Sequence, residues 1–137
     1  MTKLKDPPAP FAQECPDPQL VEDLKESIVR QLRLNLARNS ESASSQEVWT
    51  AVCLAVRERI MERYMKTQNA HVEKDARRIH YLSLEYLMGR LLNANLCNLG
   101  IRDSIDRALD ELGYELPELC EEEHDMGLGN GGLGRLA

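Results

Sequence analysis

The sequence is most constrained by its glycine-rich end, residues 127–137, which reads GLGNGGLGRLA. Five of the chain's eight glycines lie in this stretch. Glycine permits a positive φ angle and lets another group come close to the backbone. From Leu133 onward the residues can start a helix. The pattern therefore predicts a glycine turn leading into a helix N-terminus, whose free N–H groups suit an anion, above all a phosphate. A flexible terminal loop is the alternative that the glycines alone leave open.

The spacing from Gly129 to Gly134 also fits the G-x-G-x-x-G pattern of dinucleotide-binding folds. That fingerprint must follow a buried strand near the start of a βαβ unit. Residues 120–125 instead read CEEEHD, an acidic run that favours a helix over a central strand. The match is therefore weak support for a nicotinamide or flavin site. A helix that begins at Leu133 ends after one turn, so we expect the chain to be truncated where its site begins.

Composition and charge are those of an ordinary globular protein. The chain has 137 residues, of which 42% are hydrophobic and 29% are charged. Its net charge of −6 gives no basic footprint for nucleic acid. It has no apolar run of membrane-spanning length and no apolar stretch typical of a signal peptide. We therefore expect no nucleic-acid partner and no membrane partner.

The cysteines and histidines do not form a metal-binding or disulfide pattern. No C-x-x-C and no H-E-x-x-H occurs among Cys15, Cys53, Cys97, Cys120, His71, His80 and His124. Scattered cysteines favour reduced thiols, as in the cytosol, over a disulfide framework or a zinc site. We expect no metal, and each histidine to be structural or exposed.

Two long amphipathic helices are predicted after an irregular, proline-rich arm at residues 1–16. Asp17 and Pro18 are typical of a helix start, and leucine or isoleucine then recurs every four residues, predicting a helix to about Ala37. Ser44 and Glu47 form a capping box for the second helix. Its apolar stripe is Val48, Val52, Val56, Ile60 and Tyr64. Its expected solvated face is Glu58, Arg59, Glu62 and Arg63.

After a polar break at residues 69–77, residues 78–85 are the only convincing strand. This stretch is nearly apolar on both faces, which is typical of a sheet interior, so its partner strands are expected beyond residue 137. Glu85 ends the strand, where ligands gather in open α/β sheets; the alternative is a surface acid or a cap. Two short helices stopped by Gly100 and Gly113 follow, and Pro117 opens a last acidic turn.

Two motifs now carry a resemblance. Residues 81–90, YLSLEYLMGR, followed by residues 121–126, EEEHDM, and the glycine-rich end resemble the N-terminal part of the glycogen/starch (α-glucan) phosphorylases. The motifs are separate, specific and fittingly spaced, and the resemblance extends more weakly back to the second helix. It implies that residues 17–137 are an incomplete N-terminal domain, whereas the arm at residues 1–16 has no counterpart.

The resemblance implies an α/β fold, namely a mostly helical piece of a two-domain (GT-B type) glucosyltransferase with one strand at about residues 78–85. The family moves a glucosyl unit from the non-reducing end of an α-1,4-glucan to inorganic phosphate and releases glucose 1-phosphate. It holds pyridoxal phosphate as a Schiff base on a C-terminal lysine that is absent here, so this chain alone is expected to be inactive. The parent is expected to be a cytoplasmic homodimer that degrades glycogen.

The resemblance also assigns site residues. The amides of Gly131 and Gly132 would hold the substrate phosphate, and Asn130 and Leu133 would lie against the glucosyl unit. Glu85 would shape the same cleft. No catalytic residue and no metal ligand is expected in this chain.

Regulation is expected to differ from that of the animal enzymes. Those members carry a phosphorylatable serine between basic residues near the N-terminus, whereas the first serine here is Ser27, inside a predicted helix. Their AMP pocket uses aromatic and basic side chains where this chain has Tyr64, Lys66 and Val72. We therefore expect no AMP control, as in a bacterial or plant-like enzyme. The alternative function is a small helical interaction module with an anion-binding tail.

Overall fold

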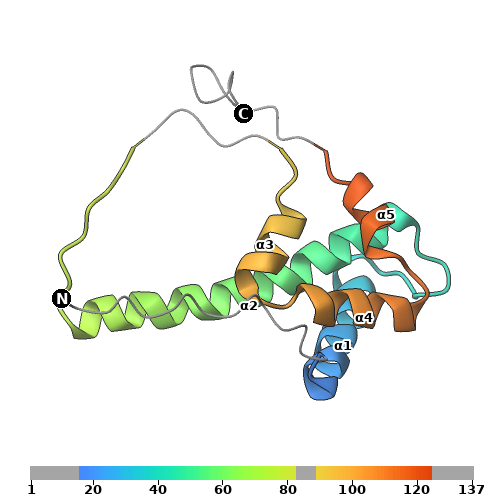
Figure 1. Ribbon diagram of the computed structural model, residues 1–137, viewed down its shortest axis with the longest axis horizontal. Coiled ribbons are helices and arrows are strands. Elements are labelled where there is room, and N and C mark those ends of the chain that lie inside the picture. The colour runs from blue at the N-terminus through green and yellow to red at the C-terminus, as the bar shows by residue number, and fades with distance from the viewer. Residues whose placement is uncertain (1–15, 83–88, 125–137) are drawn as a thin grey trace, which may run out of the picture.

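The computed structural model describes residues 16–82 and 89–124, which contain five α-helices (Figure 1). In chain order the helices are α1 (Pro18–Asn35), α2 (Ser45–Glu73), α3 (Leu92–Leu99), α4 (Arg102–Leu112) and α5 (Leu116–Glu121). Within the described ranges the chain is mostly helical and contains no strand. No helix in these ranges is both long enough and apolar enough to cross a bilayer.

The core lies where α1, α4 and α5 meet the first half of α2. α1 packs against both α2 and α4, and α5 packs against α2 and α4, while α3 crosses α2 and reaches α4 (Figure 1). The largest fully buried side chains come from all five helices: Leu24, Ile28, Leu32, Val48, Val52, Leu96, Ile105, Leu109, Leu116 and Leu119. Burial of this apolar surface is the main force that holds the helices together.

The predicted helix ends are confirmed. The Asp17 side chain accepts a hydrogen bond from the Gln19 N–H at 3.1 Å, and Pro18 is the first residue of α1. The capping box at the start of α2 is complete, because Ser44 and Glu47 each accept from the other's backbone N–H, at 3.3 and 2.9 Å respectively. Gly100 and Gly113 end α3 and α4 with φ angles of 70° and 85°, in the left-handed region that favours glycine.

The apolar stripe of α2 is confirmed only in its first half. Val48, Val52 and Val56 are buried, Ile60 is half-buried, and Tyr64 is 53% exposed. The predicted polar break at residues 69–77 is wrong in its first part, because α2 continues to Glu73. Residues 69–73 contain neither glycine nor proline, so nothing in them stops a helix that is already formed.

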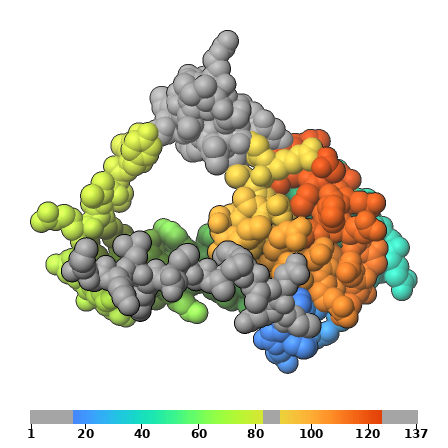
Figure 2. All heavy atoms as spheres, viewed as in Figure 1, coloured from blue at the N-terminus to red at the C-terminus, as the bar shows by residue number. Residues whose placement is uncertain are grey.

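The strand predicted at residues 78–85 does not form in the part that the structure describes. Residues 78–82 adopt no regular secondary structure, and Ile79 and Leu82 are 93% and 92% exposed. Figure 2 shows this yellow-green segment standing away from the helical body. A strand needs a neighbour to pair its N–H and C=O groups, and the described residues supply none. Residues 83–85 lie outside the described ranges.

The expected solvated face of α2 is confirmed at Glu62 and Arg63, which are exposed, whereas Glu58 and Arg59 are half-buried. Glu58 joins α2 to α1, because its carboxylate accepts hydrogen bonds from Ser27 Oγ at 2.8 Å and from Arg30 Nη2 and Gln31 Nε2 at 2.6 Å each. Arg63 Nη2 donates to the Leu99 carbonyl at 2.9 Å and so connects α2 to the end of α3. Charged residues at these positions therefore orient the neighbouring helices.

Candidate functional site

All of the predicted site residues lie outside the described ranges. Glu85 falls within residues 83–88, and the other four, Asn130, Gly131, Gly132 and Leu133, fall within residues 125–137. The structure describes the segments that lead into and out of them. The first is residues 89–92, which follow the motif that contains Glu85. The second is residues 121–124, which precede the glycine-rich end. The geometry of these two segments is therefore the geometry available for the candidate site.

The two segments are in direct contact through Glu123. Its Oε1 accepts a hydrogen bond from the Leu91 N–H at 2.7 Å, and its Oε2 accepts one from the Leu92 N–H at 2.9 Å. These amides open α3, which has no side-chain cap from its own N-terminal residue. The first N–H groups of a helix lack intrahelical partners and lie at the positive end of its dipole. A carboxylate with one oxygen for each amide satisfies both needs, so Glu123 caps α3 from far along the chain.

A second link runs parallel to the first. Arg90 Nη1 lies 2.6 Å from Glu121 Oε2, and this hydrogen bond raises the pKa of the Arg90 guanidinium above its ordinary value. Both side chains are well exposed, so solvent screens the pair and its contribution to stability is small. The ion pair nevertheless joins the same two segments as Glu123. Two contacts thus hold the two motif flanks side by side.

Glu123 lines a cavity between α2 and the start of α3. The cavity has a volume of about 200 Å³ and is lined by Cys53, Val56, Arg57, Ile60, Leu91, Leu92, Asn95 and Glu123. Burial raises the pKa of the Cys53 thiol to about 12, and the negative charge of Glu123 and the nearby Cys120 add to the shift. Burial likewise raises the pKa of Cys120. Because thiols react as thiolates, neither group is a nucleophile near neutral pH.

The capping role of Glu123 was not predicted. In the sequence it stands out only as part of the acidic run at residues 120–125 and of the motif EEEHDM, because a partner more than thirty residues away leaves no local pattern. One signal was present at the start of α3. Leu91 occupies the N-cap, a position where serine, threonine, aspartate or asparagine is preferred. A helix start without such a residue leaves its first N–H groups open to a partner from elsewhere in the chain.

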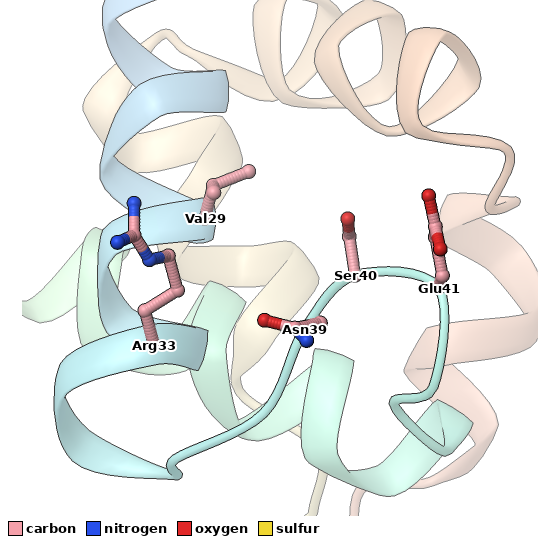
Figure 3. A pocket seen from close by; sticks show the side chains of 5 residues that line it. All are labelled: Val29, Arg33, Asn39, Ser40 and Glu41. Atoms are coloured by element: carbon pink, nitrogen blue, oxygen red, sulfur yellow. The ribbon is translucent and has the colours of Figure 1, made fainter.

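The remaining cavities of the described part show no comparable arrangement. Figure 3 shows one beside the α1–α2 connection, where Val29 and Arg33 come from α1 and Asn39, Ser40 and Glu41 come from the connection. Its polar side chains are exposed or half-buried, and they include both a positive and a negative group. In the described ranges no group of three or more histidine, cysteine or acidic side chains is placed to hold a metal ion.

The chain was compared with protein families and with individual proteins of known function. No family model matches the chain. Over 117 residues, 85% of the chain, it is 44% identical to glycogen phosphorylase of Chlamydia trachomatis and 46% identical to that of Chlamydia pneumoniae. Over the same length it is 41% identical to the human liver form of glycogen phosphorylase. The chain belongs to the glycogen phosphorylase family. This confirms the resemblance predicted from the two motifs.

The chain is much shorter than these glycogen phosphorylases. The matched residues cover 14% of the length of each relative. Bacterial and animal glycogen phosphorylases match the chain at similar identity, so the level of identity does not separate the two groups. Membership of the family rests on the match over 85% of this chain.

Proposed function

We propose that this chain is the N-terminal part of an α-glucan phosphorylase, a glycosyltransferase that acts in glycogen degradation. The reaction is transfer of a glucosyl unit from the non-reducing end of an α-1,4-glucan to inorganic phosphate, which gives glucose 1-phosphate. The observation that carries this proposal is the 44–46% identity to chlamydial glycogen phosphorylases over 85% of the chain. The alternative of a helical interaction module gains no support from these relatives.

The finer fold follows from the same proposal. Residues 17–137 are the start of an N-terminal domain in a two-domain, GT-B type fold, and residues 1–16 are an arm. Residues 78–85 become a sheet strand once partner strands from the rest of the enzyme are present. The near-complete exposure of Ile79 and Leu82 supports this proposal, because such apolar side chains are ready to be covered.

The proposed substrate site combines residues from both motifs. The amides of Gly131 and Gly132 bind the phosphate, Asn130 and Leu133 contact the glucosyl unit, and Glu85 shapes the pocket. The contact between the motif flanks supports this grouping. Glu85 lies four positions before Gly89, and Gly131 lies eight positions after Glu123, so contact between the two flanks shortens the stretch of chain that separates the two motifs.

Pyridoxal phosphate is proposed to be bound outside this chain. The described lysines do not fit a Schiff-base pocket, because Lys66 and Lys74 are exposed and Lys25 pairs with Glu22 and Glu111 at 2.6 and 3.1 Å. The chain alone is therefore proposed to be inactive. The whole enzyme is also proposed to be a cytoplasmic homodimer. The 137-residue chain, mixed with glucan, phosphate and pyridoxal phosphate, should release no glucose 1-phosphate; measurable release would contradict the assignment of essential residues elsewhere.

Activity of the whole enzyme is proposed to be independent of AMP. Val72 stands where AMP-regulated relatives are expected to carry an aromatic ring, and it is 72% exposed on α2. Loss of a stacking ring removes roughly 1–3 kcal/mol of base binding. Assays with and without AMP should agree, and strong activation by AMP would refute this part of the proposal.

The phosphate site itself is tested by Gly132→Val in a full-length phosphorylase that contains this segment. A β-branched side chain resists a positive φ angle and fills the space of the phosphate. Loss of preorganised backbone donors typically costs about 3–4 kcal/mol, which corresponds to a hundredfold or greater fall in activity. The expected result is a large loss of kcat/KM for phosphate with a modest change in the thermal midpoint.

The matched control is Gly113→Val at the end of α4. Gly113 has a φ angle of 85° and lies away from both motifs, so a side chain there strains a structural turn. This variant should lower the thermal midpoint and leave the KM for phosphate of the surviving enzyme unchanged. If Gly132→Val behaves in the same way, the glycine-rich end is a structural turn and the site assignment is wrong.

A further inference from the structure

Glu123 belongs to one of the two segments that flank the motifs, residues 121–124, and its carboxylate binds the other, residues 89–92. Its two carboxylate oxygens accept from consecutive amides, at 2.7 Å from Leu91 and 2.9 Å from Leu92. Hydrogen bonds to an ionised acceptor are shorter and stronger than those between neutral groups. Leu92 is buried and Leu91 half-buried, so water competes little for these amides. The carboxylate therefore holds the start of α3 against residues 121–124.

The other contacts at this junction constrain the flanks less. The Arg90–Glu121 pair is exposed and joins two long side chains. These side chains can change rotamer and keep the ion pair while the backbone segments shift relative to each other. Cys53 and Cys120 lie near Glu123 but are neutral thiols, because burial raises the pKa of each. Backbone amides, in contrast, cannot move without moving the chain. The pairing of Glu123 with two of them is therefore the contact that sets the relative position of the flanks.

We propose that Glu123 is a positioning residue of the phosphorylase reaction. By capping α3 it holds residues 89–92, which follow the motif that contains Glu85, against residues 121–124, which precede the glycine-rich end. This inference rests on the function proposed above. Glu123 touches neither substrate nor cofactor in this account. It acts through the two segments that it joins, and a displacement of about 1 Å at a reacting centre is enough to cost about a hundredfold in rate.

The chemistry of the cap defines the informative variants. Glu123→Gln keeps the size of the side chain but replaces one acceptor oxygen by an NH2 group, which faces an amide N–H and cannot bond to it. Glu123→Asp keeps both oxygens and the charge but is one methylene shorter, so it reaches both amides only if the chain shifts. The neighbouring Glu122→Gln removes the same charge from a residue that has no role in the cap, and is the matched control.

The test uses a full-length phosphorylase that contains this segment, with inorganic phosphate and a maltodextrin as substrates. Glu123→Gln is expected to lower kcat/KM for phosphate by 10- to 100-fold, about the scale of misplaced reacting groups. Glu123→Asp should restore part of that loss, and Glu122→Gln should stay within about twofold of the unchanged enzyme. Amide hydrogen exchange is expected to accelerate in Glu123→Gln at whichever of Leu91 and Leu92 loses its acceptor, and not in Glu122→Gln, which reports on the cap without reference to activity.

Three outcomes separate the possibilities. A lower thermal midpoint with unchanged kcat and unchanged KM for phosphate would show that Glu123 only stabilises α3, and would overturn the inference. If Gly132→Val loses phosphate use while Glu123→Gln does not, the proposed function stands and the positioning role fails. If neither variant changes phosphate use, the proposed site itself fails. Should Glu123→Gln not fold, the Glu123→Asp variant decides, because an unaltered kcat/KM for phosphate in that enzyme would contradict the inference.

Discussion

The two halves of α2 share a helix and a hydrophobic pattern but differ in what surrounds them. In the first half, Val52 is fully buried, and α2 packs against α1, α3 and α5. In the second half, which extends beyond the other helices in Figure 1, Tyr64 is 53% and Val72 is 72% exposed. The same apolar periodicity thus ends in a core at one end and at a bare surface at the other.

This difference shows that periodicity predicts which face of a helix is to be covered, but not which chain covers it. A helix of this length forms along its whole extent once its first half is packed, because propagation adds one hydrogen bond per residue. Met61, Tyr64, Met65 and Val72 are exposed on this half, and we propose that the rest of a phosphorylase covers them. Ile79 and Leu82, beyond the end of α2, are exposed as well.

The largest expected contrast is between the same substitution in the two halves. Val52→Asn should destabilise the chain by about 3–5 kcal/mol, because it removes buried apolar surface and leaves an amide without partners. Val72→Asn should change the free energy of unfolding by less than about 0.5 kcal/mol. Urea denaturation followed by circular dichroism measures both. Equal midpoints for the two variants would mean that the halves are buried alike.

The reactivity of the Cys53 thiol reports on the burial of the first half of α2 and needs no substitution there. Burial raises the pKa of Cys53 to about 12, whereas Cys97 lies exposed on α3. At about pH 8 only about one Cys53 in ten thousand is a thiolate, the form that reacts. Peptide mapping after brief alkylation should find Cys97 modified well before Cys53. Comparable rates at the two sites would show that α2 separates readily from its neighbours.

The smallest effect concerns pH and the start of α2. The N–H of Ser44 and then the side chain of Arg38 lower the pKa of Glu47, so its ionised form is favoured in the folded state. Ionised Glu47 contributes to the free energy of unfolding at pH values above its ordinary pKa of 4.5. This contribution is lost as the pH falls through the lower pKa that Glu47 has in the folded state. Glu47→Gln should therefore reduce the fall in thermal midpoint between about pH 6 and about pH 3. Glu73→Gln, at the exposed end of α2, is the control and should retain the full fall.

Much of the helical framework could be predicted because its signals are local. Asp17, the Ser44–Glu47 box, Gly100 and Gly113 each act within one helix turn, and the structure confirms all four. The strand at residues 78–85 depends on partners that the described residues do not supply, so its apolar character on both faces predicted burial that Ile79 does not have. The cap by Glu123 joins residues more than thirty positions apart, and no local pattern encodes it. The glycine-rich site remains a prediction from motif resemblance.

We propose that the second half of α2, which is exposed here, is covered in a full-length phosphorylase that contains this chain. Native-state amide hydrogen exchange along α2, in the 137-residue chain and in a full-length enzyme that contains it, tests this directly. We expect strong protection at residues 48–56 in both proteins, and protection at residues 61–73 only in the full-length enzyme. Rapid exchange at residues 61–73 in the full-length enzyme, or strong protection there in the chain alone, would contradict the claim.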